Sequence, residues 1–259
     1  MVDSIQRFST RVGNYANYRP GYPAEIIGLL VSECGLTTDS VIADIGSGPG
    51  NLAEIFLNHG NQVFAVEPSP GMREAAERGL GSYPNFISID GSAEATTLGE
   101  GSVDIVAAGQ AFHWFDQESA RREFVRILRA EGCVVLVWNE RRLEATPFLR
   151  DYENFLIKFG TDYQRIRHEN VQNDLHPFFA PGSFKVAVLE NRQAFDLDGL
   201  TGRVLSNSYS PEPGNPNYQP MVEELRALFE QHQAGGLVTI EYHAKVYFGH
   251  LRLRQDLPD

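Results

Sequence analysis

Short apolar runs recur along the first half of the chain and alternate with longer segments in which apolar residues return every three or four positions. A short apolar run is typical of a buried strand, and a 3.6-residue period is typical of one helix face. The predicted strands are residues 41–46, 62–67, 85–90, 103–109 and 133–139, and the predicted helices are residues 51–59, 69–80 and 117–130. This alternation predicts βαβ units, and so an α/β fold with a doubly wound, mostly parallel sheet.

The pattern loosens on either side of this core. A further helix is predicted from Pro23, another strand at residues 184–190, and a closing antiparallel strand at residues 237–251, where apolar and polar residues alternate. Four prolines at residues 208–220 indicate a loop. Between the predicted strands, one helical segment carries an aromatic stripe that predicts core packing, at Phe148, Tyr152, Phe155, Leu156 and Phe159.

The length and composition agree with one domain. The chain has 259 residues, 42% of them hydrophobic, which is enough for a sizeable core. We expect a single domain over residues 1–259, with helices on both faces of the sheet. Its predicted parts are a core at about 36–142, an N-terminal cap at 1–35, and helical insertion or lid elements at about 143–180 and 196–235.

Charge narrows the classes of partner. The chain has 22 Lys and Arg against 34 Asp and Glu, a formal net charge of −12, so we expect neither a nucleic-acid nor a membrane partner. The first residues lack the apolar core that a signal peptide has, and no apolar run approaches the roughly 20 residues of a membrane span, so we expect a cytoplasmic protein. We expect it to be a monomer or a homodimer. Cys34 and Cys133 form no metal-ligand cluster, so we interpret both as structural and expect no metal.

Three glycines at alternate positions join the first predicted strand to the next helix, in the sequence VIADIGSGPGNLAEIF. Glycine in such a turn adopts positive φ or lets a ligand approach the backbone. A tight turn without a ligand is the alternative. Because ligands of parallel sheets bind at the carboxyl ends of the strands, Gly46, Gly48 and Gly50 are candidate ligand-binding residues.

An acidic residue closes the second predicted strand. The Glu67 carboxylate can accept two hydrogen bonds from a ribose diol, which suits a nicotinamide dinucleotide or S-adenosylmethionine. The dinucleotide fingerprint G-x-G-x-x-G requires glycine at position 51, where the chain has Asn51. The sequence therefore favours S-adenosylmethionine, and an NAD-dependent dehydrogenase is the weaker interpretation.

The segments Asp44-Ile-Gly-Ser-Gly-Pro-Gly50, Val66-Glu67-Pro68-Ser69 and Gly91-Ser-Ala-Glu94 resemble the cofactor motifs of class I S-adenosylmethionine-dependent methyltransferases. The resemblance spans about residues 40–140 and implies a seven-stranded sheet whose last strand is antiparallel. It places Gly46 and Gly48 near the methionine end, Glu67 on the ribose, and Ser92 where the family often has aspartate. The cofactor-binding residues it implies are Asp44, Gly46, Ser47, Gly48, Gly50, Glu67, Pro68, Ser92, Ala93 and Gln110.

Residues 17–23 and 109–116 resemble a small-molecule branch that includes trans-aconitate methyltransferase-like enzymes. For a hydroxyl acceptor, His113 is a candidate base beside Trp114. For a carboxylate acceptor, the candidate substrate-binding cations are Arg141 and Arg142, and Arg19 is a candidate for holding the cofactor's carboxylate. A cofactor-binding regulatory module without turnover is the other functional class that the sequence allows.

Overall fold

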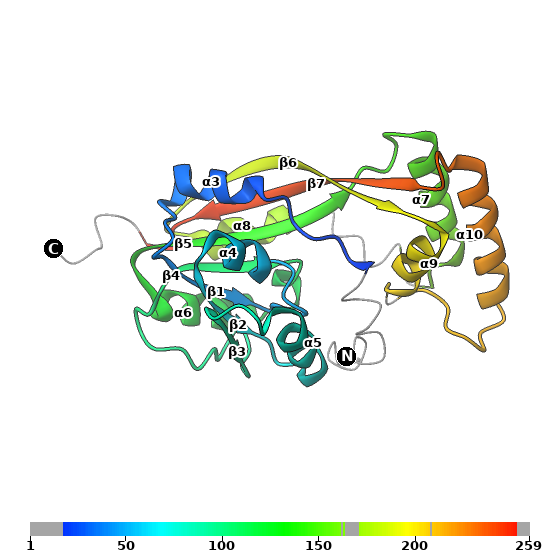
Figure 1. Cartoon of the computed structure of the whole chain (residues 1–259). Coiled ribbons are helices and arrows are strands. Elements are labelled where there is room, and N and C mark those ends of the chain that lie inside the picture. The colour runs from blue at the N-terminus through cyan, green and yellow to red at the C-terminus, as the bar shows by residue number, and fades with distance from the viewer. Residues whose placement is uncertain (1–17, 162, 164–170, 208, 253–259) are drawn as a thin grey trace. The chain divides into compact units, whose positions relative to one another are not determined.

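The computed structural model of the chain describes residues 18–161, 163, 171–207 and 209–252 (Figure 1). A seven-stranded sheet has the strand order β3-β2-β1-β4-β5-β7-β6, with the last strand, β7, antiparallel. The strands are β1 Val41–Ile45, β2 Gln62–Val66, β3 Phe86–Ile89, β4 Val103–Gly109, β5 Leu128–Arg141, β6 Phe184–Phe195 and β7 Val238–Gly249. The helices are α3 Glu25–Cys34, α4 Ala53–His59, α5 Pro70–Leu80, η1 Phe112–Trp114, α6 Gln117–Ile127, α7 Pro147–Phe159, α8 Val171–Phe179, α9 Leu197–Leu205 and α10 Tyr218–His232.

The predicted α/β sheet and its closing antiparallel strand are confirmed. The chain forms two compact units, and three of the boundaries between them fall within β5, β6 and β7. Unit 1 is Met1–Pro20, Glu140–Glu169 and Glu190–His243, and unit 2 is Gly21–Asn139, Asn170–Leu189 and Ala244–Asp259. The single-domain organisation stays a prediction.

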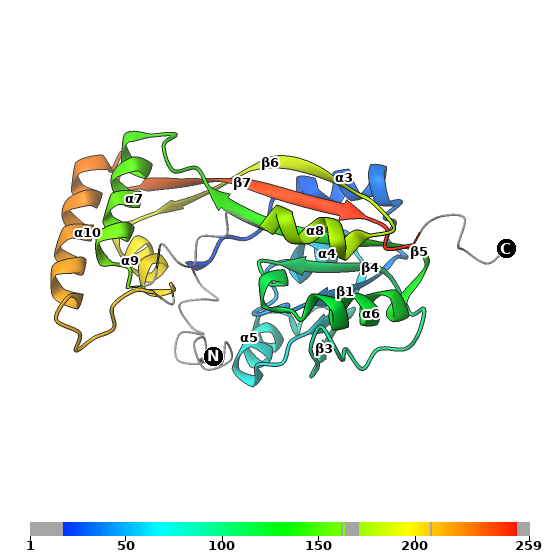
Figure 2. The same ribbon diagram turned by 180° about the vertical axis from the view of Figure 1, so that it is seen from behind.

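Unit 2 buries both faces of its part of the sheet. Helices α3 and α4 lie over one face (Figure 1). There Ile26 and Leu30 of α3 and Phe56 of α4 share a core with strand residues such as Ile42 and Ile105. The opposite face is covered by α6 and α8, as Figure 2 shows, with side chains that include Phe124, Ile127, Leu175 and Phe178. Helices on both faces explain why β1 and β4 consist almost entirely of apolar residues.

Unit 1 has its own core, formed by α7, α9, α10 and strand residues such as Ile240 and Tyr242. The predicted aromatic stripe of α7 lies in this core, with Tyr152 fully buried, so that prediction is confirmed. Local signals explain where the helices start: the Thr146 side chain accepts a hydrogen bond from the Leu149 N–H at the start of α7, and Asp196 accepts one from Gly199 at the start of α9. In the described part of the chain, no helix has the length and apolarity that a membrane crossing requires.

One secondary-structure prediction was wrong. Residues 128–130 belong to β5 and not to the preceding helix, because Val103 of β4 pairs with Leu128. The range predicted as helical at 143–180 contains α7 and α8, and its role as an insertion or lid stays a prediction. Of these two helices α8 belongs to unit 2, where Leu175 and Phe178 are buried in the core on the sheet face that α6 also covers.

The two cysteines lie side by side, which the sequence did not indicate. Cys34 ends α3 and Cys133 lies in β5, and their Sγ atoms are 2.6 Å apart with both thiols free. Burial and the neighbouring Cys34 thiol both raise the pKa of Cys133, the Cys34 contact being the larger cause. Cys133 is therefore a buried, protonated thiol, in agreement with a packing role.

Candidate functional site

The strand register of unit 2 brings the candidate residues to one edge. Ile45 pairs with Val66, and Val66 pairs with Ile89, so the chain leaves β1, β2 and β3 at the same level. Asp44 pairs with Ala107, which places Gly109 of β4 level with Gly46. Parallel strands thus align the glycine turn, Glu67, the segment after β3 and the β4 tip, as the sequence predicted.

The glycines of the turn are required by backbone conformation and, at two positions, by packing. All three glycines have positive φ, of 65° at Gly46, 56° at Gly48 and 93° at Gly50. A Cβ at Gly46 would lie 2.7 Å from the Ala111 Cβ, and one at Gly50 would collide with Leu80, whereas a Cβ at Gly48 would have no atom within 4 Å. Packing therefore explains two of the glycines, and Gly48 leaves an open approach to the backbone.

Glu67 is held in one orientation by the backbone around it. Its Oε2 accepts a hydrogen bond from the Gly48 N–H at 3.0 Å, and its Oε1 accepts one from the Ser69 N–H at 2.9 Å. The side chain is 9% exposed, and burial raises its pKa despite these two bonds and the nearby Arg73. Each carboxylate oxygen retains acceptor capacity for a ligand hydroxyl.

Asp44 is the second buried carboxylate at this edge. It is fully buried, and in the described part of the chain neither of its oxygens has a hydrogen-bond partner. Burial raises the pKa of Asp44 to about 7. The Ala53 N–H acts against this rise, although it is not placed well enough to count as a hydrogen bond, and the negative charge of Glu67 adds to the rise. An unpartnered buried carboxylate is costly, so this position favours a cationic or hydrogen-bonding ligand group.

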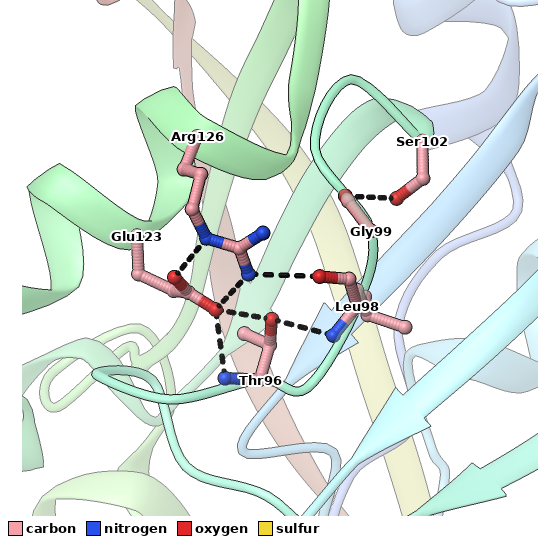
Figure 3. Close-up of polar contacts among 6 residues, drawn as sticks. All are labelled: Thr96, Leu98, Gly99, Ser102, Glu123 and Arg126. Carbon is pink, nitrogen blue, oxygen red and sulfur yellow. Dashed lines mark hydrogen bonds and ion pairs between the residues drawn. The ribbon is translucent and has the colours of Figure 1, made fainter.

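A hydrogen-bond network anchors the loop that follows β3. Glu123 of α6 accepts hydrogen bonds from the N–H and hydroxyl of Thr96, at 2.9 and 2.5 Å, and from Arg126 (Figure 3). Arg126 also donates to the Leu98 carbonyl at 2.8 Å. The hydrogen bond from Arg126 is the largest cause of the low pKa of Glu123, about 2. This network fixes the end of the segment that contains the predicted Ser92 and Ala93.

Ser92 and Ala93 begin that segment. The Ser92 N–H donates to the Ala95 carbonyl at 3.1 Å, and the Ala95 N–H donates back to the Ser92 carbonyl at 3.2 Å. The resulting tight turn buries the Ala93 side chain and leaves Ser92 half-buried. The serine side chain reaches less far than the aspartate that the resembled family often has at this position. A contact between the Ser92 hydroxyl and a ligand therefore stays a prediction.

The β4 tip has an uncommon backbone conformation. Gln110 has φ 55°, although it is not glycine, and its side-chain amide donates to the Asn139 carbonyl at 3.2 Å. Asn139 in turn donates to the Gly21 carbonyl at 3.1 Å, and the Tyr22 ring packs directly against Gly109. Positive φ at a non-glycine residue is found more often at functional sites than elsewhere.

The residues after the β4 tip form a short aromatic turn. Phe112 is buried in the core, 4.7 Å from the Phe178 ring centroid. His113 is half-buried, and its ring centroid lies 4.7 Å from that of Trp114, which is 47% exposed. The buried Phe112 thus orients the turn, and the exposed Trp114 gives it an apolar surface on which a planar ligand can pack.

The three predicted arginines lie in unit 1, where each has protein contacts. Arg141 donates to Glu153 and to the Tyr163 hydroxyl, and Arg142 forms an ion pair with Glu241 at 2.8 Å. Arg19 donates to the Ser206 carbonyl at 3.3 Å. Binding of cofactor or acceptor by these three arginines stays a prediction.

Sequence reasoning missed three contributors to this edge. Arg73 donates to the Glu67 carbonyl at 2.8 Å and pairs with Asp90 at 3.0 Å, so it ties β2 to the end of β3. Tyr22 and Asn139 support the β4 tip. Tyr22 and Asn139 could have been found from the sequence, because Tyr22 lies in the segment 17–23 and Asn139 ends the predicted strand 133–139. Arg73 lies in an ordinary helical pattern, and nothing in the sequence around it indicates its role.

Comparison with known proteins identifies the central segment. Residues 43–136 match the family model of a methyltransferase domain. A methyltransferase-like protein of Schizosaccharomyces pombe is 32% identical over 159 residues, which is 61% of this chain and 60% of that protein. An uncharacterised methyltransferase of Mycobacterium tuberculosis strain H37Rv is 37% identical over 139 residues, 54% of each chain. The chain thus spans less than two thirds of the length of these curated relatives.

Solved structures support the fold over a longer span. A candidate type II methyltransferase from Anaeromyxobacter dehalogenans has a TM-score of 0.64 at 20% identity, covering 93% of this chain and all of that one. A candidate methyltransferase of an antibiotic biosynthesis pathway from Anabaena variabilis has a TM-score of 0.63 at 24% identity, covering 90% and 98%. Residues 43–136 are thus similar to a methyltransferase domain, and the sheet has the fold of these solved structures.

Proposed function

We propose that the chain is an S-adenosylmethionine-dependent methyltransferase that acts on a small-molecule acceptor. The observation that carries this proposal is the pair of buried carboxylates, Asp44 and Glu67, beside the open side of Gly48. S-adenosylmethionine is cationic at its sulfonium and ammonium groups, whereas the pyrophosphate of a dinucleotide would add negative charge. Two buried carboxylates therefore favour the methyl donor over NAD.

The residues at this edge suit the donor's parts. Glu67 would hold the ribose diol, because its two oxygens are already oriented by backbone N–H groups and retain free lone pairs. Asp44 would balance the ammonium group, and the backbone at Gly48 would admit the methionine end. Ser92 and Ala93 would lie at the adenine edge, and Gln110 near the methionine end.

When bound, the donor supplies an electrophilic methyl group on sulfur. The protein's part is to hold the donor and align the acceptor, because an in-line displacement depends mainly on orientation. His113 would accept a proton if the acceptor is a hydroxyl, and a carboxylate acceptor would need no base. Trp114 would give the acceptor an apolar wall.

We favour a carboxylate acceptor. The segment 109–116 resembles aconitate-type enzymes, and a small anion needs a local cation in a chain with a net charge of −12. The antibiotic-pathway description of the Anabaena protein agrees with a small-molecule acceptor. The other functional class, a binding module without turnover, keeps the same donor site.

Two measurements on the full chain test the proposal. Calorimetry with S-adenosylmethionine, S-adenosylhomocysteine and NAD tests the donor site, and we expect binding of the first two only. A methyl-transfer screen with isotopically labelled donor over small acids, phenols and amines tests turnover. Donor binding without transfer to any acceptor would favour the binding module, and absence of donor binding would refute the proposal.

A further inference from the structure

A second group of buried polar side chains lies in the core of unit 1, apart from the residues assigned to the donor. At its centre is Arg203 of α9, which is 5% exposed. Its Nη1 donates to the Asn207 side chain at 2.8 Å, and Tyr152 of α7 and Tyr242 of β7 interact with it electrostatically. Arg141 belongs to the same group, because its guanidinium carbon lies 5.2 Å from the centre of the Tyr152 ring.

The described residues do not balance the positive charge of this group. Among the described residues, no carboxylate lies within ion-pair distance of Arg203, and Glu153 is the one buried carboxylate of unit 1. Glu153 already accepts hydrogen bonds from Arg141 and Tyr163. A guanidinium stays charged at physiological pH. Of the described residues, the buried Arg203 and the largely buried Arg141, whose side chain is 10% exposed, therefore have one more positive charge than Glu153 compensates. Such a charge is strongly unfavourable in a core unless an anion joins it.

Unused donors accompany this charge. The Nε atoms of Arg203 and Arg141 and the hydroxyl of Tyr152 are buried and make no hydrogen bond within the described chain. Burial raises the pKa of Tyr152 to about 12, so its hydroxyl carries a proton at neutral pH. These donors come from α7, α9 and β5, and Tyr152 interacts electrostatically with both arginines.

We propose that Arg203, Tyr152 and Arg141 form a subsite that binds a carboxylate group of a small organic acid. The single uncompensated charge matches a monoanionic carboxylate better than a phosphate dianion, and a guanidinium can bind a carboxylate through two parallel hydrogen bonds. The subsite rests on the proposed function in one respect, namely that the acid it binds is the methyl acceptor. Its central residue, Arg203, has no recognisable sequence motif around it.

Binding of acids to the full chain without any methyl donor tests the subsite directly. The probes are acetate, succinate and citrate, with phosphate and chloride at equal ionic strength as controls. We expect the carboxylates to raise the Tm of the wild-type chain more than phosphate or chloride does. Arg203→Met should lose this response, with acid affinity at least tenfold lower, and Arg150→Met, on the exposed face of α7, should keep it.

Arg203→Met also distinguishes a role of Arg203 in acid binding from a role in folding. Methionine removes the uncompensated charge, so Arg203→Met should keep or raise the Tm measured without acid. If that variant does not fold, Arg203→Lys keeps the charge without the planar guanidinium and should still weaken acid binding. Unchanged acid affinity in every folded Arg203 variant, or no carboxylate response in the wild type, would overturn the subsite.

Donor binding distinguishes this failure from failure of the proposed function. Calorimetry with S-adenosylhomocysteine should give the same affinity for Arg203→Met as for the wild type. Normal donor binding without an acid response would overturn the subsite alone. An acid response without donor binding would overturn the methyltransferase proposal and leave an acid-binding site.

Discussion

Replacing Glu67 with alanine tests the donor site at its most constrained residue. The substitution removes the carboxylate that accepts hydrogen bonds from Gly48 and Ser69, together with the acceptors proposed for the ribose. The two effects act on different quantities: the internal bonds contribute to folding, and the ribose bonds contribute to donor affinity.

The expected loss of affinity can be estimated from the hydrogen bonds. A hydrogen bond to a charged group contributes about 1.5–3 kcal/mol, so two of them give about 3–6 kcal/mol. Water can replace part of this interaction, which reduces the expected loss to about 2–4 kcal/mol, or about 30- to 700-fold in Kd. Stability should change less, because alanine also removes a carboxylate whose burial is unfavourable, as its raised pKa indicates.

Calorimetric titration with S-adenosylhomocysteine measures the affinity, and urea unfolding measures the stability. Glu67→Gln should give an intermediate loss, because it keeps one oxygen acceptor and places an amide against a backbone N–H. Glu77→Ala, at an exposed position of α5, is the matched control and should bind normally. Wild-type affinity in a folded Glu67→Ala chain would refute the ribose assignment.

Four further outcomes are expected. Gly48→Val should fold, at a cost of about 1–2 kcal/mol for its positive φ, yet block the donor; normal binding would mean that the glycine turn is structural only. Because the pKa of Asp44 rises from 3.8 to about 7 on folding, the unliganded chain should lose stability as pH increases from about 4 to 7, and urea unfolding of Asp44→Asn should show a flatter profile. The pH dependence that Glu123 gives to stability has the opposite sign, because its pKa falls from 4.5 to about 2 on folding. Its contribution to stability should be complete above about pH 4.5 and be lost towards pH 2, and Glu123→Gln should remove that dependence. His113→Ala should reduce kcat by about 10²–10⁴ if histidine is the base, whereas a mild effect at all pH values would support the carboxylate acceptor.

Local patterns in the sequence were sufficient to predict the strands and turns that meet at the carboxyl edge of the sheet in unit 2. The run from Val41 to Ile45 is apolar, and a glycine-rich turn and a helical period follow it directly, so strand, turn and helix can be predicted from neighbouring residues alone. Glu67 is predictable for the same reason, because it closes the next apolar run. Parallel pairing then aligns these strand ends with no further information.

Tertiary packing decided how the residues at that edge are used. The glycines look equivalent in the sequence, yet packing against Ala111 and Leu80 accounts for Gly46 and Gly50 and leaves Gly48 open. The family resemblance already made Asp44 a candidate, but only the structure shows that it is fully buried and that its carboxylate has no hydrogen-bond partner among the described residues. These differences depend on side chains from distant segments, which a local pattern does not contain.

The arginines illustrate the same limit. Arg141 ends β5 and Arg142 follows it, so both were predictable as candidate cations at a strand end. Their carboxylate partners, Glu153 and Glu241, were not predictable, and Glu241 is 99 residues from Arg142. Arg203 had no local signal at all, because its charge is informative only when it is buried without a counter-ion. The sequence by itself therefore determined the order of strands and turns along the chain and the residues at their ends. Tertiary structure decided which charges are neutralised by other described residues and which are buried without a counter-ion among them, because that depends on side chains from distant segments.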